Sequence, residues 1–141
     1  MKYPRIWIAA HGGPMEVALD PDTPAGILAL LSRDADWQVR WRVAQHRNTP
    51  IDVVNRLADD EVLFVRASAA HNSNVGTDVL EKLAADGASE VRAAVGVNPN
   101  TPGEVLNRLS RDEHENVRRA VVENPNAPPA ARRRATAPVW G

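Results

Sequence analysis

The stretch TPGEVLNRLSRDEHENVRRAVVENPN, residues 101–126, decides the fold, because most of the chain repeats it. Moved back by 26 residues at a time, it aligns without a gap on residues 75–100, then on 49–74 and then on 23–48. A constant period of this length is typical of repeat architectures, in which each unit buries its apolar face by stacking on its neighbours. The sequence therefore predicts one repeat domain over residues 1–141, with four full units.

Each unit predicts two short helices, here called helix A and helix B. In helix A, apolar side chains recur at positions i, i+1 and i+4, as in Ile27, Leu28 and Leu31, which indicates a helix face and not a strand. Helix B is centred on a Val-Arg pair, such as Val91 and Arg92, with a second small apolar residue four positions later. The predicted fold class is therefore all-α, without the strand of an ordinary leucine-rich repeat.

Turn residues predict how these helices begin and end. Three units open on Thr-Pro, and we expect the threonine hydroxyl to cap the N-terminus of helix A. The third unit opens on Val-Gly, so Thr77 or Asp78 is the expected substitute. Asn-Pro-Asn, at 98–100 and 124–126, is expected to end helix B with an asparagine in the left-handed conformation.

The two ends of the chain predict partial caps. Residues 1–22 combine an irregular cap with the end of a truncated repeat, and residues 127–141 start a fifth unit in register. The core positions of that fifth unit are Ala131, Arg132 and Ala135, and such a loss of large apolar residues suits a solubilising cap. We expect residues 132–134, three consecutive arginines, to be solvated, with contact to an anion as the alternative. Residues 139–140 are expected either to fold back on the last repeat or to be disordered.

With the pattern D…VR..V..NPNTP..LL..LA over residues 17–137, the chain resembles the leucine-rich repeat variant family and, more loosely, short HEAT-type repeats. The resemblance implies a right-handed α-solenoid of stacked helix pairs, with helix A short and in part 3₁₀. It implies a scaffold and not a reaction. Some members of that family are associated with an iron–sulfur cluster bound by cysteines outside the repeats, but this chain has no cysteine, so we expect no cofactor.

The composition gives no strong attraction toward nucleic acid or membranes. The 17 basic and 18 acidic side chains nearly cancel, for a net charge of −1. No apolar run approaches the roughly 20 residues of a membrane span, and the apolar stretch near the N-terminus is too short for a signal peptide. Without cysteine there is neither a disulfide nor a thiolate metal site. We expect a cytoplasmic protein that does not enter membranes.

The most regular charged feature is a pair of columns, in which one aspartate and one arginine recur in every unit. We expect a buried ladder, in which each arginine bridges the aspartate of its own unit and that of a neighbour. The alternative is a row of guanidinium groups that binds phosphate or acidic peptides. The columns consist of Asp34, Asp60, Asp86 and Asp112, and of Arg40, Arg66, Arg92 and Arg118.

The outward face of helix B changes from aromatic in the first unit to charged in the fourth. Large exposed apolar patches usually mark interaction sites, and Trp37 and Trp41 lie one turn apart on this face. Three explanations stay open: the N-terminal segment with Tyr3, Ile6 and Trp7 covers them, a protein partner or second copy binds them, or a base stacks on them. The candidate binding face consists of Trp37, Trp41, Leu63, Phe64 and His71, and the anion or nucleic-acid alternative adds Arg42 and Arg47.

Other polar patterns predict no site. Acid–base pairs at i, i+4 on helix A, such as Asp52 with Arg56 and Asp78 with Lys82, are expected to neutralise one another. His46 and His71 could lie close together, but two ligands make a poor metal site.

The sequence holds no catalytic motif. We therefore expect a non-enzymatic scaffold or protein–protein interaction module without metal or cofactor, with a homodimer through the tryptophan face as one form. Nucleic acid is the less favoured partner.

Overall fold

The structure is a computed structural model that describes the backbone of residues 2–137 and the side chains of residues 4–137. This part of the chain forms eleven α-helices and no strand. The helices are α1 (Lys2–Ala10), α2 (Pro14–Leu19), α3 (Ala25–Leu31), α4 (Trp37–Gln45), α5 (Ile51–Leu57), α6 (Leu63–His71), α7 (Thr77–Leu83), α8 (Ser89–Val97), α9 (Gly103–Leu109), α10 (Glu115–Glu123) and α11 (Pro129–Thr136). The predicted all-α class is confirmed.

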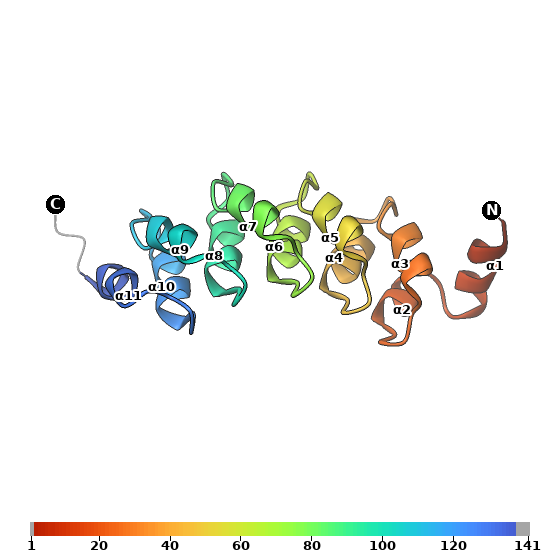
Figure 1. The fold of residues 1–141 in the computed structure, drawn as a ribbon. Coiled ribbons are helices and arrows are strands. Elements are labelled where there is room, and N and C mark those ends of the chain that lie inside the picture. The colour runs from red at the N-terminus through yellow and green to blue at the C-terminus, as the bar shows by residue number, and fades with distance from the viewer. Residues whose placement is uncertain (1, 138–141) are drawn as a thin grey trace.

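Short and longer helices alternate with a regular spacing. Each full unit holds a first helix of seven residues (α3, α5, α7 and α9) and a second helix of nine residues (α4, α6, α8 and α10). The first helices are α-helical over these bounds, whereas the family resemblance implied a 3₁₀ part. Figure 1 shows the pairs following one another in a single row, with the first helices along one edge.

The core runs along the whole row. Successive second helices pack on one another from α2 to α10, and each first helix packs on the second helices before and after it. Leu28, Leu80 and Leu106 of the first helices and Val65, Val91 and Val117 of the second helices are fully buried. Each unit therefore depends on its neighbours to remove its apolar side chains from water.

The N-terminal end is more regular than predicted. Residues 2–10 form helix α1, where we expected an irregular cap, and Gly12 and Gly13 end it with φ angles of 95° and 100°. Glycine adopts this left-handed region without a steric penalty, so the pair turns the chain sharply into α2. Ile8 of α1 is buried against the core. The side chain of Tyr3, which we expected in the cap, lies outside the described residues.

At the other end, α11 is the first helix of the fifth unit, in the register that the repeat predicts. Ala131 and Ala135 are buried, but Arg132 is not a core residue, because its guanidinium reaches back and donates to the carbonyl of Asn124 at 2.8 Å. Arg134 donates to the hydroxyl of Ser110 at 2.7 Å, so the arginine run is fastened to the last repeat and not merely solvated. Residues 139–140 lie outside the described residues.

The predicted threonine N-cap is wrong. The first helices begin after Pro24, Pro50, Gly76 and Pro102, and none of these four helices has a side-chain cap at its N-terminus. The hydroxyl of Thr49 instead donates to the carbonyl of Val43, near the C-terminus of α4, at 2.7 Å, and Thr23 and Thr101 repeat this contact at 2.6 Å. These buried hydroxyls therefore satisfy the end of the preceding helix.

The asparagines that end the second helices also differ from the expectation. Asn98 and Asn124 have φ angles of −70° and −77°, so neither uses the left-handed conformation. Their side chains form a buried column along the row: the Asn98 amide donates to the carbonyl of Ala70 at 2.7 Å, and its oxygen accepts from the N–H of Asn100 at 2.8 Å. Asn72 and Asn124 make the equivalent contacts. The column thus links the C-terminal ends of successive second helices.

His46 occupies the first place in this asparagine column. Its Nε2 lies 2.8 Å from the carbonyl of Asp20, and its Nδ1 accepts from the N–H of Asn48 at 3.0 Å. This pattern corresponds to the neutral ring with its proton on Nε2. His46 is therefore a structural residue of the repeat.

Gly96 provides a test of how tightly the second helices pack. A Cβ at Gly96 would lie 2.8 Å from the Cβ of Ala120 on α10, whereas a Cβ at Gly26 of α3 would meet nothing within 4 Å. We expect Gly96→Ala to lower the free energy of unfolding by about 1–2 kcal/mol, because overpacking outweighs the better helix propensity. Gly26→Ala should raise it by about 0.5–1 kcal/mol. Urea unfolding followed by circular dichroism measures both, and the same sign for the two variants would contradict this packing.

Candidate partner-binding face

The aromatic side chains of α4 and α6 form one exposed group, here called the aromatic cluster and consisting of Trp37, Trp41 and Phe64. Asp36 positions it, because its carboxylate caps α4 by accepting from the N–H of Gln38 at 2.9 Å, and Trp37 begins the helix. Val39 and Val43 of α4 are buried. Residues 37 and 41, one turn apart, consequently lie on the side of α4 away from the valines.

The rings contact one another across the two repeats. The centroids of Trp37 and Phe64 lie 5.9 Å apart with an interplanar angle of 30°, and those of Trp37 and Trp41 lie 6.4 Å apart. Phe64 remains 51% exposed and Trp37 36% exposed, while Trp41 is partly buried against the core. The guanidinium carbon of Arg42 lies 4.5 Å from the centre of the Trp41 ring. Neighbouring repeats thus present a continuous aromatic surface with a cation at its edge.

The remaining candidate residues are spread along the same side of the row. Leu63 is partly buried against the core. His71, at the end of α6, lines a hollow of about 190 Å³ with Ala93 of α8 and Arg119 of α10. Partial desolvation of the ring lowers the pKa of His71, although the residue as a whole is exposed. The structure therefore brings the aromatic residues together but places His71 beside a separate hollow.

Arg42 and Arg47 line another hollow, of about 320 Å³, together with Leu19 and His46. Arg47 also forms an exposed ion pair with Asp22 at 3.7 Å. These two arginines thus line one hollow, although Arg47 already has a carboxylate partner.

The aromatic contacts of the N-terminal helix are separate from the aromatic cluster. Trp7 stacks on His11 of the same segment, with ring centroids 3.8 Å apart. Within residues 4–137, the aromatic partners of Trp37 are Trp41 and Phe64. Among these residues, Trp7 therefore makes no ring contact with the tryptophans of α4, which the explanation with a covering N-terminal segment would lead one to expect.

The aspartate and arginine columns connect neighbouring units. Arg66 donates through Nε and Nη2 to the Asp86 carboxylate, at 2.8 and 3.1 Å, and through Nη1 to the carbonyl of Asp60 at 2.8 Å. Arg40 with Asp60, and Arg92 with Asp112, repeat this bidentate pair. Each aspartate also accepts from the N–H two residues later, as Asp86 does from Ala88 at 2.9 Å. The guanidinium groups of Arg40, Arg66 and Arg92 are therefore engaged within the fold.

Asp34, the first aspartate of its column, and Arg118, the last arginine of its column, have no such ion-pair partner among the described residues. Asp34 accepts from the N–H of Asp36 at 2.8 Å, but no arginine precedes it at the required spacing, where Pro14 stands. Arg118 donates to the carbonyl of Asp112 at 2.7 Å, and within residues 4–137 no carboxylate pairs with it.

The paired aspartates predict an acid-sensitive fold. Burial raises the pKa of Asp60, Asp86 and Asp112, but hydrogen bonds from the arginines and backbone N–H groups outweigh it, so each pKa lies below its ordinary value of 3.8. A carboxylate with a lowered pKa stabilises the fold above its unfolded-state pKa, and this stabilisation is lost as pH falls through the folded value. We expect the free energy of unfolding to drop as pH falls below about 4.

Two variants of the pair formed by Arg66 and Asp86 separate the effect of the ion pair from general acid unfolding. Asp86→Asn removes one paired carboxylate, and Arg66→Ala removes its cation, so both variants should lose stability less steeply in acid than the wild type. Urea unfolding at a series of pH values, from neutral down to about 3, measures both. An unchanged steepness in either variant would contradict the role of the ion pair.

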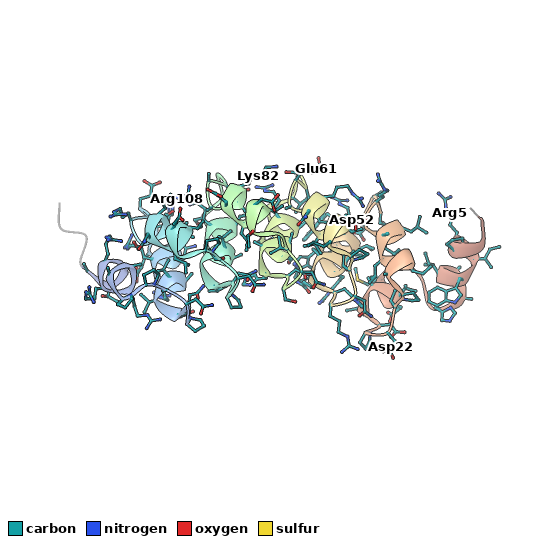
Figure 2. The ribbon with its side chains drawn as sticks, in the orientation of Figure 1. Arg5, Asp22, Asp52, Glu61, Lys82 and Arg108 are labelled. Carbon is teal, nitrogen blue, oxygen red and sulfur yellow. The ribbon has the colours of Figure 1, made fainter. Side chains whose placement is uncertain are left out.

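The charged residues of the first helices pair between repeats and not within one helix as predicted. Lys82 pairs with Asp59 of the preceding unit, and Arg108 with Glu81 at 3.5 Å, while Arg56 contacts the Ser32 hydroxyl. Figure 2 shows Lys82 and Arg108 along the edge formed by the first helices. Among the described residues, the predicted i, i+4 pairs of these helices are not formed. Two ion pairs between repeats thus take the place of the predicted pairs within one helix.

The described part of the chain shows neither a cluster of metal ligands nor a membrane-spanning helix. Among residues 4–137, no group of three or more His, Asp or Glu side chains is arranged to hold a metal ion. The helices of the described chain are all too short or too polar to cross a membrane.

Comparison with known families supports the sequence resemblance. A family model described as leucine rich repeat variant matches residues 90–114, a stretch that includes most of α8 and all of α9. Comparison with curated proteins and with solved structures gives no match. The predicted resemblance to the leucine-rich repeat variant family is thereby confirmed.

Proposed function

We propose that this chain, which matches the leucine rich repeat variant model over residues 90–114, is a non-enzymatic scaffold that binds a protein partner through the outward face of its second helices. The observation that carries this proposal is the aromatic cluster, in which Phe64 and Trp37 are 51% and 36% exposed and contact one another across two repeats. Exposed aromatic side chains that touch one another are enriched where interfaces gain most of their affinity. Arg40, Arg66 and Arg92 are engaged in ion pairs within the fold. This supports a structural role for the arginine column and argues against the alternative in which the column binds phosphate or acidic peptides.

In this proposal the helix pairs form a right-handed α-solenoid with a partial cap at each end, located in the cytoplasm. Its second helices form a continuous surface because they pack directly on one another. A partner that lies across them can therefore contact several repeats at once.

The proposal is tested with Trp37→Ser/Phe64→Ser, which removes the two exposed rings but leaves the partly buried Trp41. Ile51→Ser is a matched control, because Ile51 is 57% exposed on a first helix. Sedimentation equilibrium first tests self-association. A wild-type dimer that becomes a folded monomer in the double variant, but not in Ile51→Ser, would identify a second copy as the partner.

If the wild type is a monomer, the same three chains serve as baits for proteins of a cell lysate. We expect a defined protein to be retained by wild type and by Ile51→Ser, and to be lost with the double variant. Retention by all three chains alike, or by none, would contradict the proposed face.

The alternative is nucleic-acid or acidic-peptide binding through Trp37, Trp41, Arg42 and Arg47. One observation favours it: Arg42 lies over the Trp41 ring and shares a hollow with Arg47. Binding to phosphate groups weakens steeply as salt rises, whereas an aromatic protein interface does not. Fluorescence titration with single-stranded oligonucleotides at two salt concentrations separates the two functions.

A further inference from the structure

Among residues 4–137, the carboxylate of Asp34, at the start of the aspartate column, lacks the arginine partner that the other three members have. Asp60, Asp86 and Asp112 each accept a bidentate guanidinium from the arginine twenty residues earlier. The corresponding residue for Asp34 is Pro14, which has no group to donate. The repeat therefore leaves one guanidinium position open at its N-terminal end.

Asp34 is nevertheless held like the paired aspartates. Its Oδ1 accepts from the N–H of Asp36 at 2.8 Å, and the equivalent distances at Asp60 and Asp86 are both 2.9 Å. The carboxylate is thus oriented before any partner arrives, and the loss of side-chain entropy on binding is correspondingly small.

A cavity of about 610 Å³ lies beside Asp34, between α1, the start of α2 and the end of α3. These elements lie together at the N-terminal end of the row (Figure 1). Apolar side chains dominate its walls, and Leu30 is 40% exposed there. The lining includes Ile8, Ala9, Pro14, Leu30 and Leu31. An apolar wall beside an oriented carboxylate suits a side chain with a long aliphatic stem and a cationic end.

We propose that this cavity binds an arginine side chain of a protein partner, with the guanidinium paired to Asp34 and the methylene groups packed on Leu30 and Leu31. Arginine fits better than lysine, because its planar fork donates two parallel hydrogen bonds to one carboxylate. The chain shows this geometry three times, with Arg40, Arg66 and Arg92 as the donors. The cavity is separate from the aromatic cluster, and the proposal does not depend on the function assigned to that cluster.

Arg5 and Arg33 also line the cavity, and their charges oppose a second cation. Within residues 4–137 neither pairs with Asp34. Removing one of these charges should therefore strengthen binding of a guanidinium, and Arg5→Ala is expected to bind the probe more tightly than wild type.

The test is a titration of the full chain with N-acetylarginine amide, followed by the backbone amide signals of residues 30–36. We expect these signals to shift with a dissociation constant in the millimolar range, because a single side chain supplies all the contacts. N-acetylcitrulline amide, which has nearly the same shape without the charge, should bind at least about tenfold more weakly.

Two substitutions locate the contact. Asp34→Asn keeps the acceptor for the Asp36 N–H and should weaken arginine binding at least about tenfold. Asp52→Asn, on the exposed side of α5, should leave binding unchanged. The amide spectra of both variants also report whether they remain folded.

Other outcomes would overturn the proposal. Equal binding of the citrulline probe, or an unchanged affinity in Asp34→Asn, would remove the guanidinium–carboxylate pair from the explanation. Shifts that appear only in Arg5→Ala would show that Arg5 of the chain itself fills the position. The absence of shifts in every variant would mean that the cavity binds no arginine.

Discussion

Replacing Asn98 with alanine is expected to lower the free energy of unfolding by about 3 kcal/mol. The side chain of Asn98 is 2% exposed and makes three hydrogen bonds: its amide donates to the carbonyls of Ala70 and Asn72, and its oxygen accepts from Asn100. Alanine would leave the end of α6 with buried carbonyl groups that water cannot reach, and such unsatisfied groups cost more than the lost bonds themselves. Urea unfolding measures the difference.

Asn100→Ala is the matched control for this column. Asn100 lies two residues later, is exposed, and donates through its side chain to the carbonyl of Ser73 at 3.1 Å. Because water can replace that bond, we expect a loss below about 1 kcal/mol. Equal losses for the two asparagines would mean that burial of the column does not determine its contribution.

Replacing Arg66 with alanine should lower the free energy of unfolding by about 2–4 kcal/mol. The variant loses the bidentate pair with Asp86 and the bond to the carbonyl of Asp60. It thereby removes the paired cation from the Asp86 side chain, which is 12% exposed in the wild type. The cost lies somewhat below that of a fully buried pair, because the Arg66 side chain retains 20% exposure.

Arg118→Ala tests whether the paired carboxylate causes this loss. Arg118 has the same position in α10 and the same bond to a backbone carbonyl, here that of Asp112 at 2.7 Å. Within residues 4–137 it has no carboxylate partner, so its replacement should cost about 1 kcal/mol. If Arg66→Ala and Arg118→Ala lowered the free energy of unfolding equally, the ion pair between repeats would not be the cause of the loss.

Periodicity predicts the helices of this chain well, because burial within a repeat follows local spacing. Val53, Val54 and Leu57, assigned to one face from their spacing alone, are all buried in α5. Polar contacts at the helix ends are harder to predict. The hydroxyl of Thr49 could cap the helix that follows or contact the helix that precedes, and only the approach of the Val43 carbonyl decides between them.

For the charged columns and the aromatic residues, too, the sequence predicts which residues recur, but the contacts between them depend on how neighbouring repeats pack. A column of aspartates and a column of arginines are visible in the sequence, but the twenty-residue separation of the paired members depends on how far apart neighbouring repeats lie. Lys82 pairs with Asp59 and not with Asp78 for the same reason. Exposure of Trp37 was predicted from its place on helix B, whereas its contact with Phe64 depends on the packing of α4 on α6.

The asparagine column would have shown itself in the sequence through the constant spacing of Asn72, Asn98 and Asn124. Their position in Asn-Ser-Asn or Asn-Pro-Asn, however, is equally typical of an exposed turn. What distinguishes them is burial by the next repeat, which no single unit contains.

The contacts that join the repeats have a consequence for how the chain can change in length. Arg66 and Asp86 are 20 residues apart, and Asn98 and Ala70 are 28 apart, and both separations recur in the next unit. Excising residues 75–100 would therefore bring Arg66 to the same separation from Asp112, and Asn124 to the same separation from Ala70. Genetic gain or loss of one whole unit preserves these links, whereas a shift of a single residue breaks the links at that junction.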